Sequence, residues 1–365
     1  MGNIISKLGV FCLVAAGALA FAGSADAMSM KGNNITLRVG SGHADNITYV
    51  GQIHKFFVPR VMQRVEKETK YKIKFQEHYA GTVVNVFDTL EGTQDGRLDI
   101  GAWCVCFDDD KAMALNIFYY VPFHNPDASV NVKVMRKLIA EYPALIQDLE
   151  GRYNQKLIAV TSFNNYGLFT GFDWNKFSDL KGHKILAAGP NLPWVKGGIP
   201  VRTNIPQLAQ MMQTGVGEGV VLFPDTDYKL KLHEAVKHGV YTVTDFGGVV
   251  QIAVTMNMDT RKKLPPEVLK IIDEVARDYE TEATKVSMND HQWGLDKLKG
   301  AGVKIKTINP DAKKEWAMQL KDWPNERAHA VKDKKGIDMP KIMKAFIKME
   351  EDTGFAFPID YPISE

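Results

Sequence analysis

The chain has 365 residues, of which 45% are hydrophobic and 24% are charged. This composition is typical of a folded globular protein and excludes a chain that is mostly disordered or fibrous. At roughly 150 residues per domain, the length predicts about two lobes, each able to bury its own core. The 45 basic residues nearly balance the 43 acidic ones and leave a formal net charge of +2. We therefore expect no nucleic-acid partner and no electrostatic attraction to an acidic membrane surface.

The first 27 residues have the features of a secretory signal peptide. Lys7 precedes an apolar run over 8–22, and the small-residue ending Ala25-Asp26-Ala27 follows that run. The run is shorter than the roughly 20 apolar residues that a membrane-spanning helix needs, and glycines interrupt it. We expect cleavage near Ala27 and a periplasmic mature chain that does not insert into the membrane.

Cys104 and Cys106 are the cysteines that remain after this cleavage. Residues at positions i and i+2 of a strand point to one face of it, where a bond between the two sulfurs would be strained. The spacing therefore favours two small buried thiols, with a redox pair as the alternative in an oxidising compartment. One such pair without further cysteines cannot complete a structural zinc site.

Strands and helices are predicted to alternate through the first part of the mature chain. Helices are expected around 84–93 and over a segment with apolar residues at spacing four, namely Ile53, Phe57, Val61 and Val65. Strands are expected at 36–39, 71–75 and 98–103. Alternation at these intervals predicts a parallel sheet covered by helices.

The same α/β pattern restarts further along the chain and predicts a second lobe. A helix is expected near 207–214 and a long one from Pro266, placed to link the lobes, while Asn309-Pro310 has the features of a helix start. The strands are expected at 156–160, 184–187, 219–223, 241–243 and 249–256. The predicted division is 28–153 plus about 240–285 for the first lobe, 154–239 plus about 286–335 for the second, and 336–365 as a segment that packs on the lobes.

The sequence holds no complete motif for catalysis, for a metal or for a cofactor. His233 and His238 enclose H-E-x-x-x-H, which is one residue too long for two histidines to face one zinc on a helix. The glycine-rich stretch 215–219 lacks the spacing of a dinucleotide-binding turn, and neither a P-loop nor a G-x-S-x-G elbow occurs. We therefore expect no catalytic residues, no cofactor and no metal. Two α/β lobes with an export signal are typical of a receptor that closes on a small molecule.

Five segments between about residues 34 and 320 follow one another as LRVGSGHADN, AGTVVNVFDTLEGTQDGRLDIG, DLKGHKI, QLAQMMQTGVGEGVV and KKLPPEVLKIIDEV. In order and spacing they resemble the DctP-type solute receptors of tripartite ATP-independent periplasmic (TRAP) transporters. The resemblance implies an α/β periplasmic-binding-protein fold of two lobes, with a ligand cleft between them and one long helix spanning both. It also implies delivery of a small organic solute to the membrane subunits of a TRAP permease, driven by an ion gradient. The alternatives are an exported enzyme on the same scaffold and a receptor that serves a membrane sensor.

The resemblance further implies which position would hold the solute. The family's usual arginine, in a pattern like G-[FY]-R-x-[FL]-T, falls on Gly167 within the stretch 165–170, and a second basic position falls on Leu186. A bidentate guanidinium is the usual means of fixing a buried carboxylate, and burial without it costs several kcal/mol. We therefore expect weak binding of standard C4-dicarboxylates.

Aromatic side chains are the predicted replacement, because they can stack on a ring or surround an ammonium group. The resemblance places Trp103, Tyr166 and Trp194 on loops at the cleft. Arg202 is the remaining candidate for binding an acid, with a solvated loop residue as the alternative. Asp108, Asp225 and Asp227 are candidate counter-charges, although capping or surface positions are the commoner role for such residues. The predicted ligand-binding residues are Trp103, Phe107, Tyr166, Gly167, Trp194, Arg202 and Phe223.

Overall fold

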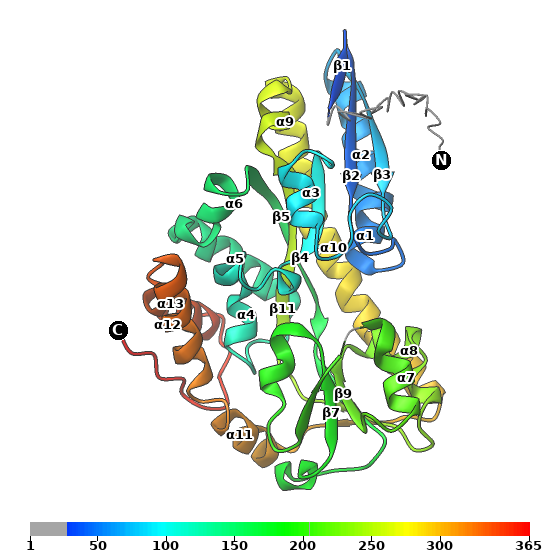
Figure 1. Cartoon of the computed structure of the whole chain (residues 1–365), viewed down its shortest axis with the longest axis vertical. Helices are drawn as coiled ribbons and strands as arrows, with labels where there is room; N and C mark the ends of the chain where they lie inside the picture. Colours follow the sequence, from blue (N-terminus) through cyan, green and yellow to red (C-terminus); the bar gives the residue numbers. More distant parts are fainter. Residues whose placement is uncertain (1–27, 204) are drawn as a thin grey trace, which may run out of the picture.

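A computed structural model describes residues 28–203 and 205–365, so the predicted signal peptide lies outside the described residues. Two six-stranded sheets form the centres of two lobes, one above the other in Figure 1. Helices cover both sheets, and the C-terminal helices lie along one side of the molecule. The two-lobe α/β architecture predicted from the sequence is therefore confirmed.

The sheet of the first lobe has the strand order β1-β2-β4-β11-β5, with β3 paired along the whole length of β2. Its strands are β1 (Ser29–Lys31), β2 (Asn34–Gly40), β3 (Lys72–His78), β4 (Ile100–Cys104), β5 (Gln155–Asn165) and β11 (Gly248–Asn257). Strand β2 runs parallel to β3 and β4, whereas β11 is antiparallel to both β4 and β5. The parallel arrangement predicted for the strands at 36–39, 71–75 and 98–103 is therefore confirmed. The whole sheet is mixed, because β1 is antiparallel to β2 and because β11 enters from the other lobe and runs in the opposite direction.

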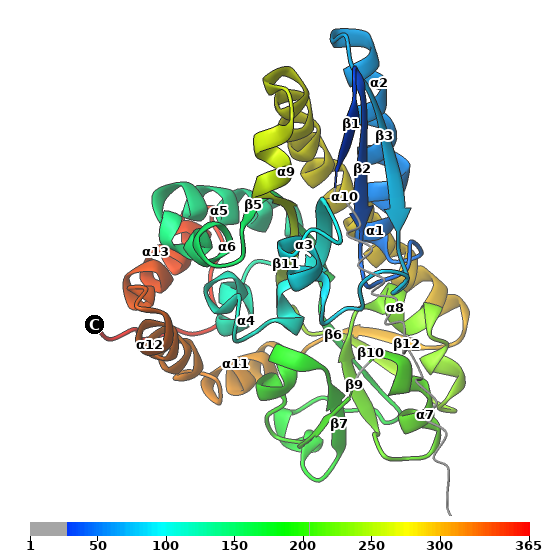
Figure 2. The same cartoon turned by 45° about the horizontal axis from the view of Figure 1, so that its top comes forward.

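The sheet of the second lobe has the order β12-β10-β6-β9-β7-β8 and is also mixed. Its strands are β6 (Gly167–Thr170), β7 (Lys184–Ala187), β8 (Ile199–Arg202), β9 (Gly219–Leu222), β10 (Val240–Val243) and β12 (Lys304–Thr307). Strand β6 is antiparallel to both of its neighbours, while β7 is parallel to β8 and β9. Figure 2 shows this sheet below the first lobe, with its short strands facing the junction.

A bent helix covers the first sheet near its N-terminal strands. It consists of α1 (Thr48–Gln52), a π-helical turn η1 (Ile53–Phe57) and α2 (Val58–Glu68). The apolar residues predicted to share one face, from Ile53 to Val65, are all buried. Pro59, the second residue of α2 after the π-helical turn, has no N–H to donate to the preceding turn.

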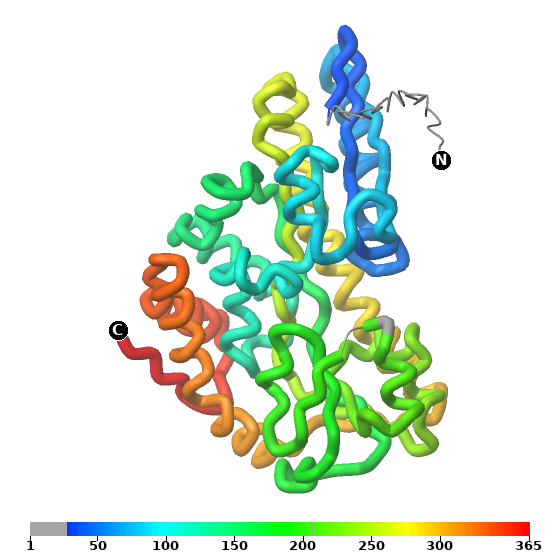
Figure 3. Tube along the Cα trace, viewed as in Figure 1, coloured from blue at the N-terminus to red at the C-terminus, as the bar shows by residue number. Residues whose placement is uncertain are grey.

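The chain crosses between the sheets at three places, which Figure 3 traces in green and yellow. Strand β5 continues into β6 through Tyr166 alone, and β10 continues into β11 through residues 244–247. The third crossing is α10 (Pro266–Gly300). Strand β5 pairs in the first sheet and β10 in the second. The chain therefore leaves the first sheet after residue 165 and returns to it at residue 248, later than the predicted limits at 153 and 240. The division into lobes by residue number stays a prediction.

Helix α10 begins at Pro266, as predicted, and contacts both lobes. The apolar face predicted for its first half is buried, including Val275 and Tyr279. Further along, Thr284 lies 2.9 Å from the Thr161 hydroxyl of β5, and Gly294 lies against the backbone of α8 (Pro224–Lys229).

Helices α12 (Trp323–Lys335) and α13 (Met339–Glu351) pack on the first lobe beside α4 and α5, whereas α11 (Pro310–Met318) contacts the 3-10 turn η5 (Phe177–Leu180) of the second lobe. The predicted helix start is confirmed, because the Asn309 side chain accepts hydrogen bonds from the first backbone amides of α11. Beyond these helices, the Tyr361 hydroxyl donates to the Pro122 carbonyl oxygen at 2.7 Å, which fastens the tail. The remaining helices are α3 (Thr89–Gln94), α4 (Ile117–Tyr120), α5 (Ala128–Glu141), α6 (Gln147–Gly151), α7 (Leu208–Gln213) and α9 (Met258–Lys263). Within the described ranges, no helix combines the length and apolar character needed to span a bilayer.

Candidate solute site at the lobe junction

The two strand crossings lie side by side and are tied together by polar contacts. The Thr244 hydroxyl donates to the Tyr166 carbonyl oxygen at 3.1 Å. Asn165 donates to Asp245 at 2.8 Å and accepts from the Gly247 amide at 3.0 Å. Any movement of one lobe relative to the other must therefore act on this small group of residues.

A continuous row of aromatic rings runs across this junction from the first lobe to the second. We call it the aromatic row; its members, in spatial order, are Phe87, Phe107, His43, Tyr49, Phe163, Phe223, Tyr166 and Trp194. Successive ring centroids lie between 4.1 and 5.8 Å apart, mostly in edge-to-face or tilted geometry. His43, Phe107 and Phe163 are half-buried, and Phe87 is 59% exposed. These four rings are the part of the row that a solute can reach.

Four of the predicted ligand-binding residues lie in this row: Phe107 is half-buried, whereas Phe223, Tyr166 and Trp194 are buried. Phe107 ends the 3-10 turn η2 (Val105–Phe107) after β4 and contacts His43 and Phe87. Phe223 follows β9 and lies 4.1 Å from the Tyr166 ring. The Tyr166 hydroxyl lies 3.0 Å from that of Tyr119, which orients the ring between the two lobes.

Two predicted residues are buried supports instead. Trp103 is 1% exposed and lies within β4, so the expected loop position is wrong; its indole donates to Thr255 on β11 at 3.1 Å. Trp194 is fully buried at the end of η6 (Gly189–Trp194), where it donates to the Tyr119 carbonyl oxygen at 2.9 Å. A direct contact of either residue with a solute stays a prediction.

Gly167 leaves no room for the arginine that its position would hold in the resembling family. A Cβ atom on Gly167 would lie 2.4 Å from the Tyr241 hydroxyl. That hydroxyl is itself fixed, because it donates to the Leu222 carbonyl oxygen at 2.9 Å. Leu186, at the second basic position, is fully buried in the core of the second lobe. Arg202 is exposed at the end of β8, at the edge of the second sheet.

The candidate counter-charges are either paired with a lysine or fully buried. Asp225 is paired with Lys229 at 3.0 Å and accepts from the Asn164 amide at 2.8 Å. Asp108 is paired with Lys111 at 2.8 Å. Burial raises the pKa of Asp227 well above its ordinary value, and neither of its carboxyl oxygens has a hydrogen-bond partner.

His43 adds no positive charge to the aromatic row at neutral pH. Burial lowers the pKa of His43 to about 4, and its Nδ1 atom lies 2.8 Å from the Tyr49 hydroxyl. The reachable rings are therefore uncharged. His43, Phe87 and Phe163 were not predicted as site residues, because only the fold brings the loop after β2, the segment before α3 and the end of β5 together.

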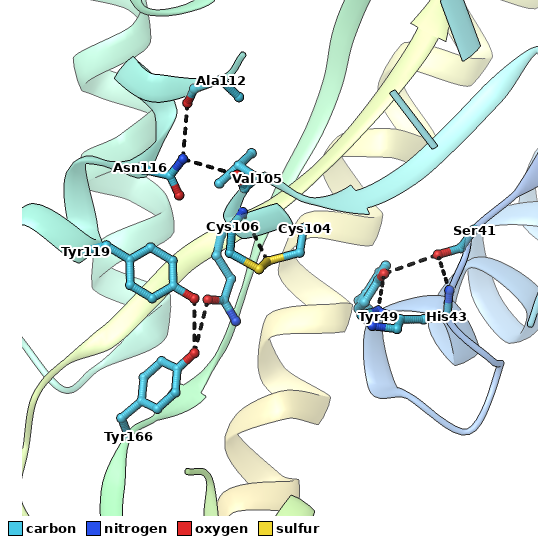
Figure 4. Close-up of a disulfide and its surroundings, with 11 residues drawn as sticks. Ser41, His43, Tyr49, Cys104, Val105, Cys106, Ala112, Asn116, Tyr119 and Tyr166 are labelled. Atoms are coloured by element: carbon cyan, nitrogen blue, oxygen red, sulfur yellow. Dashed lines mark hydrogen bonds between the residues drawn. A yellow bond between two sulfur atoms is a disulfide. The ribbon is translucent and has the colours of Figure 1, made fainter. Parts of the chain in front are cut away.

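Cys104 and Cys106 form a disulfide at the end of β4, which corrects the expectation of two free thiols. The strand ends at Cys104, and the turn η2 that follows brings the two Cα atoms to 5.1 Å. The predicted strain assumed a strand that continued through Cys106. Figure 4 shows the disulfide with the Tyr119–Tyr166 pair and with Ser41, His43 and Tyr49 from the loop after β2 and from α1.

Two hollows elsewhere in the molecule do not involve the aromatic row. A shallow one of about 550 Å³ lies along the first half of α10, between Pro266 and Arg277. A cavity of about 10 Å³ lies beneath Lys111 and Lys335. The candidate site therefore rests on the ring contacts at the junction and not on either hollow.

Fold and junction together define a two-lobed binding protein of the periplasmic type. The chain matches the family model of the bacterial extracellular solute-binding protein family 7 (DctP) over residues 50–327. It belongs to that family and is a solute-binding receptor, as the sequence resemblance implied.

Solved structures with the same fold include three TRAP or extracytoplasmic solute receptors at low sequence identity. A marine metagenome protein specific for aromatic acids, with bound 3-hydroxybenzoate, is 16% identical with a TM-score of 0.75, covering 87% of this chain and 98% of that one. A protein from Rhodoferax ferrireducens with copurified benzoate is 17% identical with a TM-score of 0.70, over the same shares. DctP6 of Bordetella pertussis, which binds pyroglutamic acid, is 19% identical with a TM-score of 0.70, covering 86% and 99%.

Proposed function

We propose that this protein is the extracytoplasmic receptor of a TRAP transporter and that it captures a small aromatic solute for a membrane permease. The aromatic row is the observation that carries the proposal, because it continues from one lobe into the other. The rings of the row that a solute can reach belong to the first lobe, and closure would bring the second lobe against a solute ring stacked on them. Ligand contacts of that kind favour the closed form of a two-lobe receptor over the open one.

The charge of the solute follows from the groups around the row. The Tyr241 hydroxyl occupies the space beside Gly167, Arg202 is exposed at a sheet edge, and His43 is neutral. A dicarboxylate entering this site would lose its water without gaining a guanidinium partner. We therefore propose an aromatic solute with at most one carboxylate. The bound 3-hydroxybenzoate and benzoate of two structural relatives support an aromatic ligand for this fold.

A thermal-shift and calorimetric screen tests the proposed solute class. Benzoate, 3-hydroxybenzoate, benzamide and benzylamine would be compared with succinate and malate on the exported protein. We expect at least one aromatic compound to bind at micromolar concentration or tighter, and succinate and malate to bind far more weakly. Tight binding of succinate or malate would contradict the inference from Gly167. Chemical analysis of the recovered ligand, expected to be unchanged, distinguishes a receptor from an exported enzyme.

Export is the second part of the proposed function. The ending Ala25-Asp26-Ala27 predicts a mature chain that starts at Met28 and resides in the periplasm. N-terminal sequencing of periplasmic material would then begin at Met28 or within a few residues of it. Recovery of the exported protein with Met1 retained would contradict this prediction.

A further inference from the structure

The Cys104–Cys106 disulfide lies where the two lobes touch. Cys104 is 2% exposed and belongs to the core of the first lobe, while the half-buried Cys106 packs against that core and against a second hydrophobic cluster that contains residues of both lobes. The facing segment is η6 of the second lobe. A Cβ atom on Gly189 would lie 3.7 Å from the Cys106 carbonyl oxygen, so the two backbones are close to van der Waals contact.

The disulfide also closes the turn that carries Phe107. Strand β4 pairs with β11 only as far as Cys104, so sheet hydrogen bonds do not hold the turn beyond that residue. What holds it is the disulfide together with a few hydrogen bonds. Asn116 donates to the Val105 carbonyl oxygen at 3.1 Å, and the Cys106 amide donates to the Cys104 sulfur at 3.3 Å. Phe107 is the next residue, and its ring reaches His43 and Phe87.

We propose that the Cys104–Cys106 disulfide is a redox-sensitive positioning element of the solute site, which holds Phe107 in place and loses that hold when reduced. The inference rests on the proposed aromatic solute site. Reduction follows ordinary thiol–disulfide exchange with a dithiol. The sulfur–sulfur bond breaks, two electrons and two protons reach Cys104 and Cys106, and the dithiol closes to its own disulfide. Phe107 then belongs to a flexible turn, and ordering that turn on binding lowers the affinity for the solute.

The test compares oxidised and reduced forms of the exported protein in two measurements. The first is affinity for benzoate and benzamide by calorimetry, and the second is hydrogen exchange of the amides in 105–107 and 189–194 without ligand. The gene used for this test would encode Cys12→Ser, so that only Cys104 and Cys106 can react. The matched control is the double variant Cys104→Ser/Cys106→Ser, which is measured with and without dithiol.

We expect reduction to weaken binding about tenfold and to speed exchange at both segments, and reoxidation to restore both values. The double variant should behave like the reduced protein and ignore the dithiol. If the disulfide had a merely structural role, reduction would lower the unfolding temperature but leave the affinity of the folded protein unchanged. That outcome overturns the proposal. So does mass analysis that finds two free thiols in protein purified without reductant.

Failure of the proposed solute class is recognised separately. If neither benzoate nor benzamide binds the oxidised protein, that class is in error, and the ligand-free exchange measurement decides the present inference. Faster exchange on reduction at both segments then supports the positioning role. Unchanged exchange overturns it.

Discussion

Single residues decide the chemical character of this junction. Gly167 and Tyr241 act as a pair, because the hydroxyl of one fills the space that a side chain on the other would need. Phe107 provides half-buried ring surface, while the indole N–H groups of Trp103 and Trp194 donate internal hydrogen bonds. The site therefore offers stacking surface and little charge, which favours a ring over a dicarboxylate.

Replacing Phe107 should weaken solute binding with little effect on folding. Phe107→Ala removes a half-buried ring that contacts His43 and Phe87, and we expect about tenfold weaker binding of an aromatic ligand, or about 1.4 kcal/mol. Titration calorimetry measures the affinity. Phe355→Ala is the matched control, because Phe355 is also half-buried but lies in the C-terminal tail. Equal affinities of the two variants would remove Phe107 from the site.

Glu350 on α13 should make the protein less stable as the pH rises. Burial raises the pKa of Glu350 from 4.5 to about 8, although its carboxylate accepts a hydrogen bond from the Asn125 amide. Between those pH values the unfolded chain has lost this proton and the folded one keeps it, so the free energy of unfolding falls with rising pH. The contribution is complete below about pH 4.5 and is lost through about pH 8.

The variant Glu350→Gln isolates this contribution from those of other buried acids. It should flatten the pH dependence of the unfolding free energy between pH 5 and 8 and make the protein more stable than wild type at pH 8. Urea unfolding at several pH values measures both effects. Parallel curves for the two proteins would contradict the buried-carboxyl explanation.

At the scale of elements, α10 is the part that both lobes share. Its first half buries an apolar face against the first lobe, and its second half contacts α8 of the second. Lys229 of α8 pairs with Asp290 of α10 at 3.6 Å, and Thr48 of α1 donates to the same carboxylate. The Asp290 side chain therefore connects elements of both lobes. Because α8 also packs closely on α10, a larger side chain at their contact should destabilise the protein.

The close approach of α8 predicts that Gly294→Ala destabilises the protein. A Cβ atom there would lie 2.2 Å from the Asp225 amide nitrogen, a backbone atom that cannot turn aside. We expect a loss of about 1–3 kcal/mol in the free energy of unfolding, measured by urea denaturation. Gly300→Ala is the matched control on the same helix, because its Cβ atom would meet nothing within 4 Å. A loss at Gly300 as large as that at Gly294 would argue for a helix-wide cause.

At the scale of the whole molecule, three crossings join the lobes, and two of them are strands tied together by Thr244 and Asn165. A hinge formed by neighbouring strands concentrates its backbone changes in few residues, so the lobes can move as rigid bodies. The aromatic row crosses at the same place, so a solute held between its half-buried rings and the second lobe should bring the lobes together.

Closure should be visible as a smaller radius of gyration. Small-angle scattering would be recorded on the exported protein alone, with a saturating aromatic ligand, and with succinate as the non-binding control. We expect a decrease only with the aromatic ligand. Identical profiles with and without a ligand that calorimetry shows to be bound would exclude closure as the binding mechanism.

Local patterns in the sequence were enough to predict some of the elements, but not helices such as α5 and α13. The start of α10 at Pro266, the limits of β7 and the cap at Asn309 agree with the structure, because each depends on neighbouring residues along the chain. The family resemblance was likewise carried by ordered local segments, and the family model confirms it.

Strand direction and the site depended on contacts distant in sequence, which only the tertiary structure decides. The direction of β11 beside β4 could not be read from its apolar run, because that run is the same for either direction. The Cys104–Cys106 bond depended on where β4 ends, and the burial of Trp194 depended on Tyr119 and Trp316. Sequence supplied the aromatic and cysteine side chains, and long-range packing decided which of them face the junction and which support it.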